Sequence, residues 1–142
     1  MTATAPSVAR WVLGGGLVVA GIGHLTSQHN EFQAQVPDWF PADADLVVLL
    51  SGVVEIGLGL ALILMSRRRA MVGWIVAAFF VMIFPGNVAQ SLEGTDAFGL
   101  DTDAKRFIRL LLQPVLIAWA LWSTDAWRTW RRGGLDAVLL HN

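Results

Sequence analysis

Residues 46–65 read Leu-Val-Val-Leu-Leu-Ser-Gly-Val-Val-Glu-Ile-Gly-Leu-Gly-Leu-Ala-Leu-Ile-Leu-Met, an apolar run with a single acid, Glu55, near its middle. A run of about 20 apolar residues is long enough to cross the hydrocarbon core of a bilayer as a helix. An ionisable side chain at that depth costs about 3 kcal/mol on insertion scales, so it usually faces a protein partner rather than lipid. The stretch predicts a membrane helix and marks Glu55 as the residue to explain.

Three further stretches share this length and apolar character. With the quoted run, the predicted spans are residues 8–27, 46–65, 71–92 and 107–127. None carries the polar stripe that a helix of a water-soluble bundle needs. No small-residue cleavage site follows the first stretch, so we interpret it as a retained helix and not as a signal peptide. The sequence predicts an all-α fold, a four-transmembrane-helix bundle that forms one domain over residues 1–142.

The composition excludes several classes of function. The net charge of −1 argues against a nucleic-acid surface. The absence of cysteine excludes disulfides, thiolate metal sites, iron-sulfur clusters and thiol-disulfide catalysis for this chain acting alone. The histidines are His24, His29 and His141, whose spacing suits neither haem nor a complete metal site, so we predict no metal. No serine has a recognisable base beside it, and we predict no catalytic residue.

Basic residues predict the orientation of the bundle. If the four spans alternate, one side of the membrane receives seven arginines: Arg10, Arg67, Arg68, Arg69, Arg128, Arg131 and Arg132. The positive-inside rule then makes both termini cytoplasmic. Five tryptophans fall near the same boundary, where indole rings settle: Trp11, Trp74, Trp122, Trp127 and Trp130. The short tail from Gly133 has an apolar side and is expected to lie on the inner surface.

Polar residues inside the spans concentrate in the predicted outer half of the bilayer. They are His24, Glu55, Asn87, Gln90, Arg109 and Gln113. Helical spacing places Ser51 or Gly52, Glu55 and Gly59 on one face, and Arg106, Arg109, Gln113 and Ala120 on another. If these faces point inward, the polar residues line one chamber, while the inner half of the bundle has almost no polar groups.

The connection between the first two spans contains Val-Pro-Asp-Trp-Phe-Pro at residues 36–41. Its two prolines favour a defined turn around the aromatic pair. Trp39 then dips into the outer interface, either as a lid over the chamber or as a plain anchor among the headgroups. Both interpretations stay open.

Three interpretations of the chamber compete. In the first, Glu55 and Arg109 form a buried ion pair whose polar neighbours only fix helix packing. In the second, the chamber binds a lipophilic molecule with a polar head, such as a quinone, that enters from the outer leaflet. In the third, Glu55 and His24 change protonation along a proton or ion path. The third is disfavoured because no polar residues continue to the cytoplasmic side.

Five motifs together resemble the DoxX-like bacterial membrane proteins. They are Gly-Ile-Gly-His-Leu at 21–25, Val-Pro-Asp-Trp-Phe-Pro at 36–41, Ser-Gly-Val-Val-Glu-Ile-Gly-Leu-Gly at 51–59, Phe-Pro-Gly-Asn at 84–87 and Arg-Leu-Leu-Leu-Gln-Pro-Val-Leu-Ile-Ala-Trp at 109–119. The resemblance implies a four-helix bundle in the bacterial inner membrane. Members of that family are linked to quinone-coupled sulfur oxidation, as in the small subunit of a thiosulfate:quinone oxidoreductase, and to assemblies that handle oxidative stress.

The resemblance also implies which residues form the site. The recurrent polar positions of the family are matched by His24, Glu55, Asn87, Arg109 and Gln113, while Leu25 and Gly86 replace its usual phenylalanine and alanine. The missing cysteines and histidine pairs argue against independent redox catalysis. We therefore expect an accessory subunit of a membrane redox assembly, in a homo-oligomer or a larger complex, with no fixed cofactor and with a quinone or lipid as the ligand. The alternatives are a purely structural membrane subunit and a small proton-coupled carrier.

Overall fold

The computed structural model describes residues 4–26, 44–93 and 103–140; within them, the side chains of residues 24, 44, 45, 86–93, 103–106 and 109 are outside the description. Its elements are α1 (Ala5–Leu25), α3 (Ala44–Leu64), the 3-10 helix η1 (Ser66–Arg68), α4 (Arg69–Glu93), α5 (Asp103–Ser123) and α6 (Ala126–Leu140). These described ranges hold five α-helices and no strand, so the all-α prediction is confirmed.

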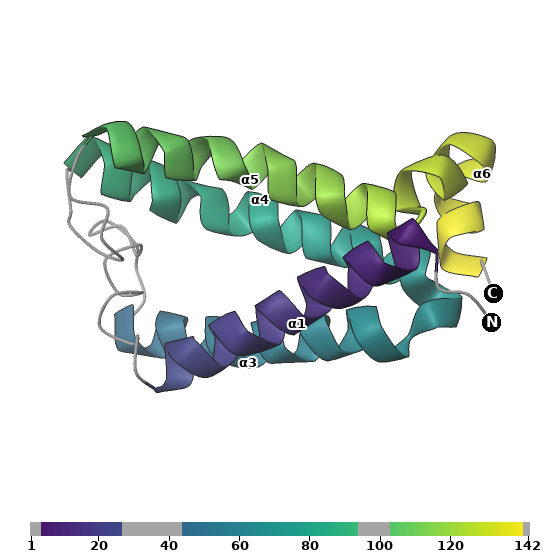
Figure 1. The fold of residues 1–142 in the computed structure, drawn as a ribbon, viewed down its shortest axis with the longest axis horizontal. Helices are drawn as coiled ribbons and strands as arrows, with labels where there is room; N and C mark the ends of the chain where they lie inside the picture. The colour runs from purple at the N-terminus through teal and green to yellow at the C-terminus, as the bar shows by residue number, and fades with distance from the viewer. Residues whose placement is uncertain (1–3, 27–43, 94–102, 141–142) are drawn as a thin grey trace.

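The long helices form two antiparallel pairs. α1 packs chiefly on α3, and α4 packs chiefly on α5. Figure 1 shows the two pairs meeting at the end of the bundle that carries η1, α6 and both termini, and separating toward the other end. The main apolar core joins the pairs and includes Leu13, Leu17, Leu62, Val76 and Ala120.

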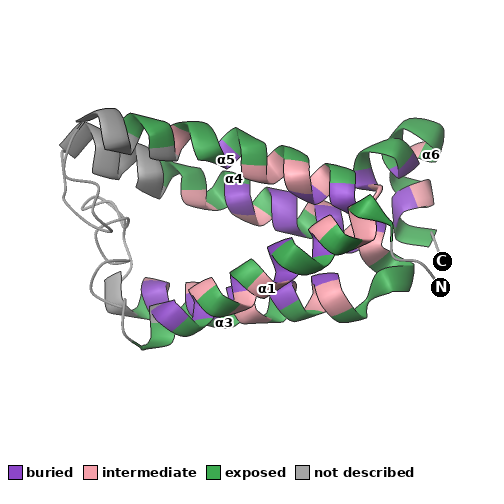
Figure 2. Cartoon of the chain, in the orientation of Figure 1, coloured by how far each residue is buried: buried purple, intermediate pink, exposed green. Residues whose placement is uncertain are grey.

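Three segments are long and apolar enough to cross a membrane: Ala5–Gly23, Leu46–Leu64 and Ser66–Pro85. α5 contributes a shorter apolar segment, Leu110–Ser123. Exposed positions run along the outside of the long helices (Figure 2), and many of them are large apolar residues, with Val19, Leu64 and Met82 each more than 70% exposed. A surface this apolar suits lipid and is rare on soluble monomers. The helical architecture and its membrane character agree with the sequence; the fourth span and the cytoplasmic termini stay predictions.

Two helix ends differ from the predicted spans. α1 begins at Ala5, because the Thr4 side chain accepts a hydrogen bond from the Ser7 amide and Pro6 suits the first turn. Arg10 therefore lies in the second turn of α1. The prediction that the last span runs to Trp127 is wrong: α5 ends at Ser123, and Asp125 takes a left-handed conformation (φ 58°) that aspartate tolerates better than most residues.

The C-terminal tail folds back on the bundle as part of α6. Gly134 interrupts the helix with φ 67°, a conformation that glycine adopts without strain. Beyond it, Val138 is buried against Ala70 and Ala126, whereas Leu135 and Leu140 stay exposed. The apolar side of the tail is therefore buried in part, at Val138, and exposed in part, at Leu135 and Leu140.

Glycines let α1 and α3 approach at backbone distance. A Cβ added to Gly14 would lie 2.7 Å from the main-chain oxygen of Gly59, and one added to Gly21 would lie 2.7 Å from that of Gly52. Such contacts between small residues are the usual way in which membrane helices pack closely. The glycine faces of α1 and α3 are therefore buried against each other, and on α3 this is the face predicted to point inward.

Candidate functional site

Glu55 lies near the middle of α3 with 6% of its surface exposed. Gly52 and Gly59, one turn to either side, are buried, and Leu62 farther along the same face belongs to the main core. The prediction that this face points inward is confirmed. A carboxyl group is thus held in the interior of the most apolar helix of the chain.

Gln113 lies near the middle of α5 and is completely buried. Its Nε2 donates a hydrogen bond to the main-chain oxygen of Phe80 in α4. Ala120, two turns farther on, is also completely buried. The inward face predicted for this helix is therefore confirmed at both described positions, and the amide ties α5 to α4 at mid-height.

The other predicted site residues fall outside the described side chains. His24, Asn87, Gln90 and Arg109 lie in α1, α4, α4 and α5, but only their helical backbone is described. Trp39 lies outside the described residues altogether. Their grouping with Glu55 and Gln113 in one chamber stays a prediction.

A second buried polar region, which the sequence did not reveal, lies at the end of the bundle that carries the termini. Arg10 is only 4% exposed, and its guanidinium donates to the main-chain oxygen of Leu62 at 3.0 Å. That carbonyl is among the last four of α3, which lack partners within the helix and form the negative end of its dipole. Among the described residues, no carboxylate pairs with Arg10, and its Nε has no hydrogen-bond partner. Arg10 therefore caps α3 from α1.

Further polar contacts tie the start of α4 to the turn between α5 and α6. Arg69 and Asp125 form an ion pair at 3.3 Å, and Trp74 Nε1 donates to the main-chain oxygen of Ala126 at 3.2 Å. Thr124, completely buried, donates to the main-chain oxygen of Ala120. The expectation of a nearly nonpolar inner half is therefore wrong. In the sequence, the apolar run continues through residue 122. Ser-Thr-Asp at 123–125 is the signal for the polar groups of this turn.

The comparisons with known proteins identify a family. Residues 13–124 match the family described as Domain of unknown function (DUF8561). The chain belongs to the DUF8561 family. No curated protein and no solved structure matches the chain significantly. The DUF8561 region holds both Glu55 and Gln113 and ends at the turn before α6.

Tryptophans gather where this DUF8561 chain turns into α6. The rings of Trp74, Trp127 and Trp130 contact one another, with centroids 5.5–6.3 Å apart. Trp119, by contrast, reaches across the bundle and donates to the main-chain oxygen of Ala9 at 2.9 Å. The clustered rings lie at the arginine-rich end, which agrees with the preference of tryptophan for a membrane boundary.

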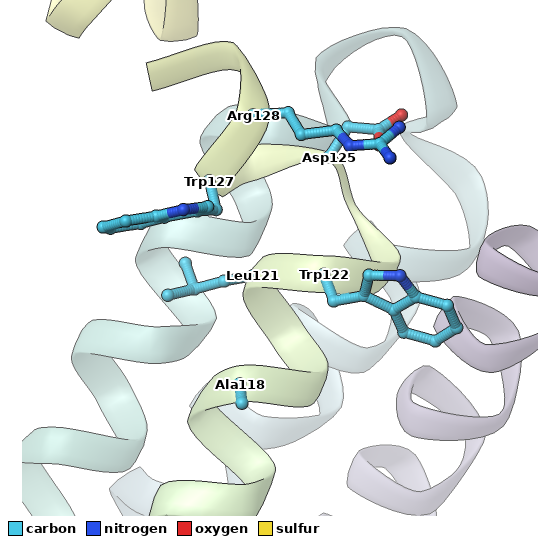
Figure 3. Close-up of a pocket in the computed structure, with 6 residues that line it drawn as sticks. All are labelled: Ala118, Leu121, Trp122, Asp125, Trp127 and Arg128. Carbon is cyan, nitrogen blue, oxygen red and sulfur yellow. The ribbon is translucent and has the colours of Figure 1, made fainter. Parts of the chain in front are cut away.

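A groove of about 320 Å³ opens beside the same turn and is lined by Ala118, Leu121, Trp122, Asp125, Trp127 and Arg128. In Figure 3, Trp122 and Trp127 spread to either side of α5, Leu121 and Ala118 lie below the turn, and Arg128 and Asp125 lie above it. Within the described ranges, no three histidine or acidic side chains are close enough together to hold a metal ion. The groove offers apolar walls with one cation at its rim.

Proposed function

We propose that this protein binds the polar head of a lipophilic small molecule, with a quinone as the leading class, at the mid-height of its membrane bundle. It does so as an accessory subunit of a redox assembly in the bacterial inner membrane, without catalytic activity of its own. Glu55 and Gln113 are the described residues of that site, and the prediction extends it to His24, Asn87, Gln90, Arg109 and Trp39.

The burial of Glu55 is the observation that supports this proposal most directly. The carboxyl group lies in a helix whose other buried residues are Val48, Gly52, Gly59 and Leu62. Keeping an ionisable group there is costly, and such residues usually mark a ligand or ion site. Completely buried Gln113 adds a second polar group near the middle of α5, in the other helix pair. A few polar groups within apolar walls are what a lipophilic ligand with a polar head requires.

We expect Glu55→Gln to weaken binding of a short-chain ubiquinone analogue about tenfold, because a hydrogen bond to a charged group contributes roughly 1.5–3 kcal/mol. The dissociation constant is measured on the purified protein from the dependence of its thermal midpoint on quinone concentration. Val53→Gln is the matched control, since Val53 is 59% exposed on the same helix and the change introduces the same amide. Val53→Gln should leave the quinone affinity unchanged.

The competing function is purely structural, with Glu55 serving only to fix helix packing. In that case Glu55→Gln shifts the thermal midpoint of the ligand-free protein and leaves quinone affinity as it was. Equal affinities in a well-folded Glu55→Gln variant and in the wild type would rule out the ligand site.

The proposed orientation has its own test, since the chain contains no cysteine to interfere with labelling. We expect Ser66→Cys, at the exposed start of η1, to resist a membrane-impermeant maleimide in intact cells and to react after permeabilisation. Thr95→Cys, in the connection on the opposite side, should react in intact cells. The reverse pattern would place both termini outside and contradict the positive-inside prediction.

A further inference from the structure

We propose that the groove at the junction of α5 and α6 binds one anionic phospholipid, with an acyl chain against Ala118 and Leu121 and the phosphate at Arg128. This site is separate from the mid-bundle site around Glu55. Its ligand belongs to the leaflet that faces the arginine-rich end of the bundle.

The shape of the groove suits an acyl chain. Ala118 and Leu121 lie about one turn apart on α5, and the small side chain of Ala118 leaves space beside the helix. The rings of Trp122 and Trp127 flank this strip (Figure 3). The volume of about 320 Å³ is at the lower end for small-molecule sites, which fits a segment of one chain and not a whole lipid.

The rim of the groove suits an anionic head. Arg128 is exposed, and within the described part of the chain its guanidinium has no hydrogen-bond or ion-pair partner. Asp125, the acid of the groove, is already paired with Arg69 at 3.3 Å. A phosphate is the group that a guanidinium binds with two parallel hydrogen bonds. The single cation of the rim is therefore available to a lipid head.

Charge across this end of the bundle favours an anionic occupant over a zwitterionic one. The described residues here include seven arginines but only two aspartates, Asp125 and Asp136. Basic pockets between helices on this side of a membrane are typical sites for anionic headgroups. The occupant therefore carries net negative charge.

The two groove tryptophans differ from their neighbours in hydrogen bonding. Trp74 and Trp119 donate their indole N–H groups to main-chain oxygens. In the described ranges, the indole N–H groups of Trp122 and Trp127 donate to nothing. A boundary tryptophan with an unused donor can bond the ester or phosphate oxygens of a lipid. These donors add headgroup contacts on both sides of the chain.

The test measures phospholipid binding to the full-length protein by native mass spectrometry, after delipidation and addition of either phosphatidylglycerol or phosphatidylcholine. We expect the wild type to prefer phosphatidylglycerol, and Arg128→Gln to lose about fivefold of that affinity with little change for phosphatidylcholine. Ala118→Phe, which fills the groove at an exposed position, should weaken binding of both lipids. Both variants change exposed side chains, and their thermal midpoints check that they fold.

Arg68→Gln is the matched control, because it removes the same charge from an exposed arginine of η1 that does not line the groove. It should change phosphatidylglycerol affinity less than twofold. Equal losses in Arg68→Gln and Arg128→Gln would mean diffuse attraction to the basic surface and overturn the site. Full affinity in Ala118→Phe, or equal affinity of the wild type for the two lipids, would overturn it as well.

Discussion

Replacing Gly59 with alanine is expected to lower the free energy of unfolding by about 1–3 kcal/mol, the usual cost of overpacking a tight contact. The added Cβ would lie 2.5 Å from the main-chain oxygen of Gly14 and 3.0 Å from the main-chain nitrogen of Val18. Both are backbone atoms, which cannot rotate away as a side chain can. α1 and α3 must therefore move apart, and the van der Waals contacts along their interface weaken together.

Gly57→Ala is the matched control for this prediction. It makes the same chemical change two residues away, at a position where an added Cβ meets nothing within 4 Å. Alanine is the better helix former, so this variant should be neutral or more stable by up to about 1 kcal/mol. The measurement is reversible unfolding in mixed detergent micelles, followed by tryptophan fluorescence. Equal stability of the two variants would show that α1 and α3 are not in backbone contact at Gly59.

The partner glycine gives a second check on the same interface. Gly14→Ala should also destabilise the protein, since its Cβ would lie 2.7 Å from the main-chain oxygen of Gly59. Once the first substitution has pushed α1 and α3 apart, the second substitution breaks fewer of the remaining contacts between them. The double variant should therefore lose less stability than the sum of the two single losses.

The sequence predicted the properties that depend on one helix at a time. A 20-residue apolar run identifies a membrane helix wherever its neighbours lie, and the three- and four-residue spacing of Gly52, Glu55 and Gly59 defines a face before any partner is known. The burial of Glu55 and Gln113 followed from the cost of exposing polar groups to lipid. The helix itself, its inward face and the burial of both polar residues are confirmed, because they rest on local pattern and solvent preference.

Properties that depend on two distant segments could not be predicted in the same way. Arg10 was expected at the membrane boundary because most arginines near a span end lie there. Its actual partner, the carbonyl of Leu62, is 52 residues away and is a main-chain atom that every residue type possesses. Composition therefore contains no signal for this contact. The turn at Thr124 and Asp125 was missed for a related reason, since Trp127 extends the apolar character of α5 past its true end.

The largest loss of stability from a polar residue is expected for Arg10→Ala, at about 2–4 kcal/mol. This change removes a hydrogen bond between a charged donor and an unpartnered carbonyl of α3, worth about 1.5–3 kcal/mol, and also the packing of the alkyl stem. Arg68→Ala is the control, since Arg68 is exposed in η1 and its loss should change stability by no more than about 0.5 kcal/mol. Both are measured by the same detergent unfolding.

Arg10→Met separates the charge of this residue from its packing. Methionine keeps much of the stem, loses the cap on α3, and removes the cost of burying a guanidinium that has no carboxylate partner among the described residues. The lost hydrogen bond lowers stability, whereas removal of the desolvation cost raises it. The free energy of unfolding of Arg10→Met should therefore fall between those of the wild type and Arg10→Ala. If Arg10→Met is instead as unstable as Arg10→Ala, packing of the stem contributes little, and the loss in both variants comes from the missing cap on α3. If Arg10→Ala is as mild as Arg68→Ala, Arg10 does not join α1 to α3, and the buried polar region at this end contributes little to the fold.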